Sequence, residues 1–231
     1  MEVVMNSALD RIKAIREELG PRLVILAHHY QRMEVADLGD FKGDSFELAR
    51  AAAAQGGAEK IVFCGVHFMA EAARILASPR QRVYVPDPSA GCPMADMVGR
   101  RDMERAWDRI RSAVDGERLI PITYMNSSAQ TKAFCGENGG IVCTSSNAER
   151  CFRWALERGE RILFVPDEFL GRNSAAQIGI PPEAVAVYNP RAPDGRLTDD
   201  EVRAAKVLVW KGYCHVHTWF TVEHVTAARE R

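Results

Sequence analysis

The stretch Leu23-Val24-Ile25-Leu26-Ala27-His28-His29-Tyr30 decides the fold class. Its first five residues are apolar without alternation, which is typical of a parallel strand buried on both faces. Polar side chains follow at once, and in open α/β sheets ligands collect outside the carboxyl ends of the strands. A second cluster, Tyr124-Met125-Asn126, follows the apolar run 119–123 in the same way. The two clusters together predict a site for a small anionic molecule.

Strand-like runs and segments with helical spacing alternate along the chain, which predicts an α/β fold with parallel sheets. The segment 180–196 is rich in Pro and Gly and is expected to be a loop. A last helix is expected from about Thr221. The other expected strands are 23–27, 61–64, 83–85, 119–123, 141–143, 162–165 and 207–210, and the other expected helices are 7–19, 45–54, 69–76, 102–114, 129–133 and 148–156.

The two halves of this pattern resemble each other, which indicates an internal duplication. Pro86-Asp87 follows the third strand of the first half, and Pro166-Asp167 follows the third strand of the second. Cys64 and Cys143 both lie in middle strands. Because Pro-Asp is also a common turn former, a chance match is the alternative.

Composition excludes several classes of protein. A chain of 231 residues with 47% hydrophobic and 26% charged content is an ordinary globular protein, and its formal net charge of -1 gives no electrostatic case for nucleic acid. No apolar run reaches the roughly 18 residues that a membrane span needs, and the N-terminus lacks the basic start of a secretory signal. We therefore expect no membrane partner and a cytoplasmic location, where the six cysteines serve as thiols or metal ligands.

Two cysteines lie in loops that favour chemistry. Cys92 lies in a Gly/Pro loop between a strand and a short helix, and Cys214 follows a strand in a Gly-Tyr-Cys loop, with His217 nearby. Such thiols suit a metal ion or a nucleophilic role, and a small buried residue is the alternative. Neither belongs to a Cys-x-x-Cys pair, so a structural zinc site is not favoured, whereas isolated cysteines from separate lobes can hold an iron–sulfur cluster. The remaining cysteines are expected to be core or incidental thiols, namely Cys64, Cys135, Cys143 and Cys151.

Polar residues at two expected helix starts have two readings. Gly43-Asp44-Ser45 and Thr144-Ser145-Ser146-Asn147 precede helices, so these residues cap the helix N-terminus or hold a phosphate or carboxylate there. Strand periodicity places His28 and Tyr30 on one face and His29 on another, and the pair is a candidate for acid–base work or for a structural hydrogen bond. No dinucleotide or Walker sequence is present.

Taken together, these motifs resemble quinolinate synthase, the iron–sulfur enzyme family of NAD biosynthesis. The match runs in family order over nearly the whole chain. The matching segments are 27–31, 39–41, 43–45, 65–71, Gly91-Cys92-Pro93-Met94-Ala95-Asp96, 124–129, 144–148 and Gly212-Tyr213-Cys214-His215-Val216-His217.

The resemblance implies that iminoaspartate, supplied by L-aspartate oxidase or aspartate dehydrogenase, condenses with dihydroxyacetone phosphate to quinolinate. It implies a [4Fe-4S] cluster held by Cys92 and Cys214 among its ligands, with an open iron that acts as a Lewis acid. It also implies three-layer parallel-sheet lobes around a pseudo-threefold axis, and a homodimer is a possible assembly. The implied catalytic residues are Tyr30, Tyr124 and His217, and the implied substrate-binding residues are His28, Ser45, Tyr124, Asn126 and Ser145.

Family members continue through a third lobe with a third cysteine and a His-Pro-Glu segment, and this chain has neither. We expect a first lobe at 1–100 with the Cys92 loop, a second at 101–217 with the Cys214 loop, and the start of a truncated third lobe at 218–231. The alternative is a non-catalytic dicarboxylate- or phosphate-binding protein of the same ancestry.

Overall fold

The computed structural model describes residues 8–230 and divides the chain into two compact units, Met1–Gly91 and Cys92–Arg231. Each unit is built on its own parallel sheet, as expected for repeated α/β lobes. The division places Cys92 with the second unit, whereas the sequence analysis assigned its loop to the first. None of the helices described for residues 8–230 is long and apolar enough to span a lipid bilayer.

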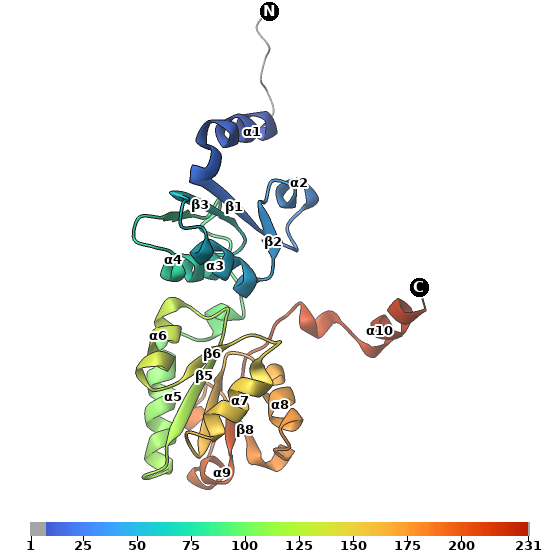
Figure 1. The fold of residues 1–231 in the computed structure, drawn as a ribbon. Coiled ribbons are helices and arrows are strands. Elements are labelled where there is room, and N and C mark those ends of the chain that lie inside the picture. The colour runs from blue at the N-terminus through green and yellow to red at the C-terminus, as the bar shows by residue number, and fades with distance from the viewer. Residues whose placement is uncertain (1–7, 231) are drawn as a thin grey trace, which may run out of the picture. The chain divides into compact units, whose positions relative to one another are not determined.

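The first unit has a four-stranded sheet in the order β2-β1-β3-β4 (Figure 1). Helices α3 and α4 cover one face through an apolar cluster around Leu48, Met69 and Phe63, while α1 lies over the other face and buries no side chain of its own. The elements are α1 (Ala8–Leu19), β1 (Leu23–His28), α2 (Met33–Ala36), β2 (Phe41–Gly43), α3 (Ser45–Ala54), β3 (Lys60–Cys64), α4 (His67–Leu76) and β4 (Arg82–Tyr84).

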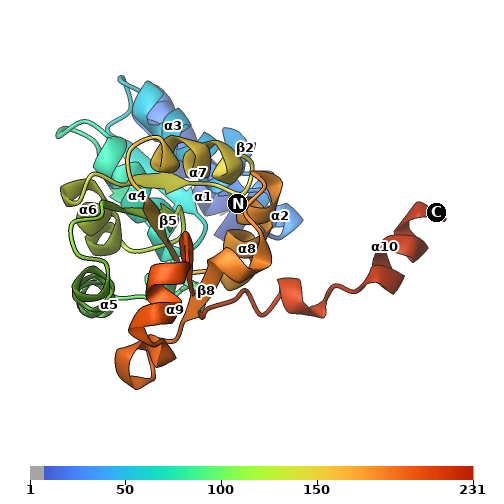
Figure 2. The same cartoon turned by 90° about the horizontal axis from the view of Figure 1, so that it is seen from below.

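The second unit has a five-stranded sheet in the order β6-β5-β7-β9-β8. Figure 2 shows α5 and α9 on one side of this sheet and α7 and α8 on the other, so the unit has three layers. The elements are α5 (Arg100–Ala113), β5 (Leu119–Tyr124), α6 (Ala129–Glu137), β6 (Ile141–Cys143), α7 (Ala148–Leu156), β7 (Arg161–Val165), α8 (Glu168–Gln177), β8 (Val185–Tyr188), α9 (Asp199–Ala204), β9 (Val207–Trp210) and α10 (Val222–Arg229).

The two sheets repeat one arrangement, because β2-β1-β3-β4 matches β6-β5-β7-β9 strand by strand. The duplication is therefore present in the topology, but the residue pairing expected from sequence is wrong. Cys64 ends β3, whose counterpart is β7, whereas Cys143 ends β6. The short edge strand β2 was missing from the expected elements, which shifted the comparison by one strand.

The expected elements are otherwise confirmed, with four further omissions. The segment 180–196 is not a continuous loop, because it contains β8, which pairs with β9. Helices α2, α8 and α9 were also missed. Ser7, the expected start of the first helix, lies outside the described residues.

Candidate functional site

The first cluster of predicted site residues lies at the carboxyl end of β1. The strand ends at His28, and a turn follows in which the backbone N–H of Gln31 donates to the carbonyl of His28 at 2.9 Å. The ring of Tyr30 lies 3.6 Å from that of His28, and the ring of His29 lies 4.3 Å from it. The three rings gather because of the turn, so the expectation that His29 points elsewhere is wrong.

His28 is held in the neutral form. The residue is 4% exposed, and burial, together with the neighbouring His29, lowers its pKa to about 4, while Asp44 acts in the opposite direction. The backbone N–H of Tyr30 donates to Nδ1 at 3.4 Å. A neutral imidazole has one donor and one acceptor nitrogen, so this contact assigns the proton to Nε2. His28 can therefore donate from Nε2 to an oxygen of a ligand.

Ser45 is the first residue of α3, and the helix is capped by its neighbour. The Asp44 carboxylate accepts from the backbone N–H groups of Phe46 and Glu47 at 2.8 Å, and Glu47 completes a capping box. The capping reading is thus confirmed for Asp44, whereas the half-buried Ser45 hydroxyl has no capping role. The Asp-x-x-Glu pattern of Asp44 and Glu47 is the sequence signal of a capping box. The proximity of Asp44 to His28 was not expected from the sequence.

The second cluster lies at the carboxyl end of β5, where Tyr124 is the last strand residue. Asn126 follows in a turn closed by the backbone N–H of Ser127, which donates to the carbonyl of Tyr124 at 3.0 Å. Asn126 is 2% exposed. Its Nδ2 donates to the Sγ atom of Cys92 at 3.5 Å, while its Oδ1 is buried and has no hydrogen-bond partner within the described part of the chain.

The loops of Cys92 and Cys214 meet through Met97. The backbone N–H of Tyr213 donates to the Sδ atom of Met97 at 3.4 Å, and the indole Nε1 of Trp210 donates to the carbonyl of Met97 at 2.8 Å. Met97 thus joins the Cys92 loop to the end of β9, from which the Cys214 loop leaves. No sequence pattern signals these contacts, because Met97 makes them through its own sulfur atom and its own backbone carbonyl. Both cysteines are half-buried.

Ser145 and His217 are exposed. The N-cap of α7 is Asn147, and its Oδ1 accepts from the backbone N–H of Thr144 at 2.7 Å. Ser145 therefore does not cap the helix, which removes the structural alternative for this residue. His217 begins a short 3-10 helix after the Cys214 loop.

The strand registers show that the predicted site residues occupy equivalent positions in the two units. His28 pairs with Gly43 between β1 and β2, and Tyr124 pairs with Cys143 between β5 and β6. The next backbone hydrogen bond, from His29 to Gly43 in one unit and from Met125 to Cys143 in the other, repeats as well. By this register Tyr124 matches His28, Asn126 matches Tyr30, and Ser145 matches Ser45.

The equivalence extends to the cysteine loops, since Cys92 follows β4 and Cys214 follows β9, its counterpart. Within the second unit, the parallel strands bring Tyr124, Asn126 and Ser145 to one edge of the sheet together with the Cys214 loop.

Three of the other cysteines behave as expected for core thiols. Cys135, Cys143 and Cys151 are buried. Burial raises the pKa of the Cys135 thiol to about 12 and raises the pKa values of Cys143 and Cys151 as well. Cys64 is half-buried and lines a surface groove, so it is not a core thiol.

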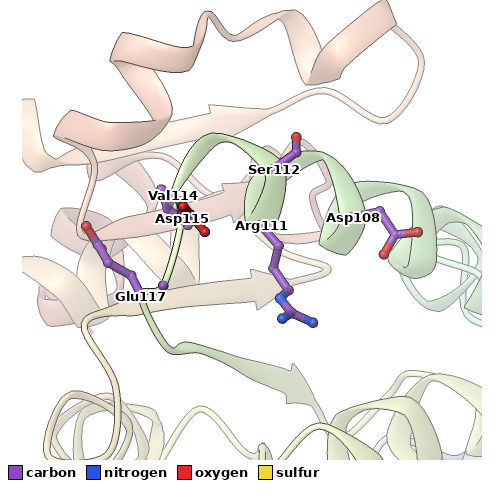
Figure 3. Close-up of a pocket in the computed structure, with 7 residues that line it drawn as sticks. Asp108, Arg111, Ser112, Val114, Asp115 and Glu117 are labelled. Atoms are coloured by element: carbon purple, nitrogen blue, oxygen red, sulfur yellow. The ribbon is translucent and has the colours of Figure 1, made fainter.

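A polar surface pocket lies elsewhere on the second unit (Figure 3). Its volume is ≈ 360 Å³, and it is lined by Asp108, Arg111 and Ser112 of α5 and by 114–117. These residues precede the first residue of β5, so the pocket lies at the amino end of that strand. Tyr124 and Asn126 lie at the opposite end, and the pocket is therefore separate from the candidate site.

Comparisons with known proteins identify the family. The model of the family described as Quinolinate synthetase A protein matches residues 10–231. The chain belongs to this family. The quinolinate synthase of Streptomyces coelicolor is 51% identical over 222 residues, which cover 96% of this chain and 56% of that protein. The quinolinate synthase of Corynebacterium glutamicum is 52% identical over 219 residues, which cover 95% of this chain and 56% of that protein.

The chain spans between 56% and 61% of the length of the curated relatives it matches. Among solved structures, an ABC transporter substrate-binding protein from Desulfitobacterium hafniense matches 79% of this chain and 75% of its own chain at 16% identity, with a TM-score of 0.24. A similarity this low supports no argument about the fold.

The residues present fit an iron–sulfur cluster in kind but supply only part of its ligands. Thiolates are the protein ligands of [4Fe-4S] clusters, and Cys92 and Cys214 offer two half-buried thiols from neighbouring loops. Among residues 8–230, no group of three or more His, Cys, Asp and Glu side chains is arranged to hold a metal ion. Cys92 and Cys214 are the residues of this chain that would hold such a cluster.

Proposed function

We propose that this chain supplies two lobes of a quinolinate synthase, in which iminoaspartate condenses with dihydroxyacetone phosphate to give quinolinate, phosphate and water. Membership of the family supports the proposal. So does the equivalence of the predicted site residues, because two duplicated sheets present polar side chains at the same strand ends. Such strand ends are where α/β proteins bind small anionic ligands.

The environment of Asn126 carries the proposal. A buried carbonyl oxygen without a partner costs about 1–3 kcal/mol, so an unpaired Oδ1 indicates a group that a ligand satisfies. The same side chain donates to the sulfur of Cys92 through Nδ2. Asn126 can thus hold a substrate N–H or O–H group beside a thiolate ligand of the cluster. The imine N–H or a hydroxyl O–H of the substrates can donate to the Oδ1 atom of Asn126.

The other side chains divide into binding and proton-transfer groups. The neutral His28 would donate from Nε2 to a carboxylate or carbonyl oxygen, and the hydroxyls of Ser45 and Ser145 would bind carboxylate or phosphate oxygens. Tyr30, Tyr124 and His217 would move protons during isomerisation and dehydration. A bound [4Fe-4S] cluster with an open iron supplies Lewis acidity, and Cys92 and Cys214 would hold it.

Anaerobic reconstitution with ferrous iron and sulfide tests the metal part. We expect the chain to bind iron and to develop the absorbance of an iron–sulfur cluster when it is extended with the region that the Streptomyces coelicolor relative has in addition. Cys92→Ser should reduce the iron content, whereas Cys151→Ser, a buried thiol away from these loops, should not. Equal iron in the two variants would contradict the assignment.

The reaction is tested on the reconstituted extended chain, with iminoaspartate generated by L-aspartate oxidase and quinolinate measured by chromatography. Asn126→Ala should abolish most of the product. Asn138→Ala is the matched control, because the Nδ2 atom of Asn138 donates only to the helix carbonyl of Phe134. Tight binding of a dicarboxylate by the metal-free chain, with neither iron uptake nor quinolinate in the extended form, would favour the binding-protein alternative instead.

A further inference from the structure

The two cysteine loops are held by the same backbone hydrogen bond. In the second unit, the backbone N–H of Glu168 donates to the carbonyl of Gly212 at 2.8 Å. In the first unit, the backbone N–H of His67 donates to the carbonyl of Ala90, also at 2.8 Å. Each donor is the first residue of its helix, α8 or α4. Each acceptor lies two residues before the cysteine that follows it, so the two contacts are equivalent.

This bond keeps its place relative to the cysteine and not relative to the end of the strand. The strand registers match Val83 of β4 with Val207 of β9. Cys92 follows Val83 by nine residues, whereas Cys214 follows Val207 by seven. A contact fixed by strand pairing alone would therefore shift by two residues along one of the loops. Its constant place before the cysteine indicates a role at the thiol.

The amino ends of the helices can supply these donors because their first N–H groups lack partners within the helix. In α8 the Asp167 carboxylate accepts from the backbone N–H of Leu170 at 2.6 Å, which leaves the N–H of Glu168 for the loop. In α4 the N-cap is Val66, whose side chain has no oxygen to cap the helix. The two helix starts thus differ in their side chains, and the feature they share is the backbone donor.

The backbone just before Cys214 is held at two consecutive residues. Gly212 is buried, and an added Cβ there would lie 2.1 Å from the carbonyl oxygen of Pro166, so this close approach requires a glycine. The next residue, Tyr213, donates its backbone N–H to the Sδ atom of Met97 at 3.4 Å. The contact with the start of α8 therefore belongs to a set that fixes the path of the chain into the cysteine.

We propose that Glu168 is a positioning residue for Cys214, because its backbone N–H holds the loop that presents this thiol to an iron–sulfur cluster. His67 has the same role for the loop that leads to Cys92. The role belongs to the backbone donor and not to the side chain. The part that concerns the cluster rests on the proposed function, whereas the hold on the loop does not depend on it.

Glu168→Pro removes the donor with little change to the helix. Proline lacks an N–H group and suits the first position of a helix, where no intrahelical bond is lost. Asp167 is already extended, with φ -107° and ψ 118°, as the residue before a proline prefers. The proline ring takes the place of the proton, so the carbonyl of Gly212 must move away. Glu168→Ala is the matched control, because it keeps the N–H and removes only the side chain, which accepts from Arg172.

Amide hydrogen exchange of the 231-residue chain, followed by NMR, tests the hold on the loop. We expect the amide of Tyr213 to exchange about tenfold faster or more in Glu168→Pro than in the wild type and in Glu168→Ala. The amides of Leu163 and Leu208, in the core strands β7 and β9, should change much less, which separates a local opening from a loss of stability of the whole unit. An unchanged rate at Tyr213, the same acceleration in both variants, or an equal acceleration of all three amides would each overturn the proposal.

His67→Pro repeats the test in the first unit, where Val66 is extended as well, with φ -93° and ψ 162°. The reporter is the amide of Ala90, which donates to the carbonyl of Asp87 at 3.2 Å. This amide should exchange faster in His67→Pro and should keep its rate in His67→Ala. Equal rates in the two variants would overturn the role of His67.

Iron release tests the role at the cluster. In the reconstituted extended chain, a chelator should remove iron about tenfold faster from Glu168→Pro than from Glu168→Ala, since partners of metal ligands typically affect metal affinity by this much. Equal rates of release would overturn the role of Glu168 at the cluster. If the extended chain takes up no iron in any form, the proposed function fails, while the exchange rate of Tyr213 still decides whether Glu168 holds the loop.

Discussion

The neutral state of His28 leads to a prediction about pH. In the folded chain the pKa of His28 is lowered from 6.5 to about 4, chiefly by burial. The unfolded chain binds a proton at this residue near pH 6.5, whereas the folded chain does not bind it until about pH 4. The contribution of neutral His28 to stability is therefore fully present above about pH 6.5 and is lost as the pH falls toward 4.

The size of the effect follows from the two pKa values. Each pH unit between them is worth about 1.4 kcal/mol, so the gap from 6.5 to about 4 corresponds to roughly 3 kcal/mol. The free energy of unfolding of a typical domain is roughly 5–15 kcal/mol, so the effect of His28 is a large part of it. Acidification to pH 4 should therefore destabilise the first unit much more than the second through this residue.

The perturbation is His28→Asn, because an Asn Oδ1 can accept the Tyr30 N–H that His28 Nδ1 accepts. Urea unfolding of wild type and variant at several pH values between 7 and 4 gives the free energy of unfolding of each. The difference between the two should change by roughly 3 kcal/mol over this range. The exposed His215 offers the control His215→Asn, whose curve should follow the wild type. NMR titration of the His28 ring with a midpoint at or above pH 6.5, or a constant difference between the two curves, would refute the reasoning.

Two further predictions concern the loops of the candidate site. Gly212→Ala should destabilise the second unit by about 1–3 kcal/mol, because the added Cβ would lie 2.1 Å from the carbonyl oxygen of Pro166. The control is Gly136→Ala inside α6, where the added Cβ meets open space. This variant should be neutral or stabilised by up to about 1 kcal/mol. Urea unfolding measures both, and equal effects would contradict the close approach. Iodoacetamide at pH 8, followed by peptide mass spectrometry, should modify Cys92 and Cys214 well before Cys135 and Cys143, since burial raises the pKa values of the latter thiols and thiolate is the reacting form. Early labelling of Cys135 would show that the core opens readily.

Periodicity predicted the long elements well, because their apolar residues face a sheet or a neighbouring helix. The helices α3 and α7 and the strands β6 and β9 have the expected bounds. It missed β2 and β8, although β4 and β6, which are likewise edge strands paired with one neighbour, were expected. It also missed α8 and α9, for which the sequence analysis expected no element. Missing β2 was enough to misalign the two halves of the duplication.

The sequence by itself determined the parallel α/β class, the strand ends at which the polar clusters lie, and the family, because each depends on local patterns or on motifs in a fixed order. Only the tertiary structure decided which residues are equivalent between the units, since equivalence depends on strand pairing across the sheet. It also decided that Asn126 contacts Cys92, that Met97 joins the two cysteine loops, and that Glu168 donates to the loop before Cys214. These contacts join residues far apart in the chain, and no local pattern encodes them.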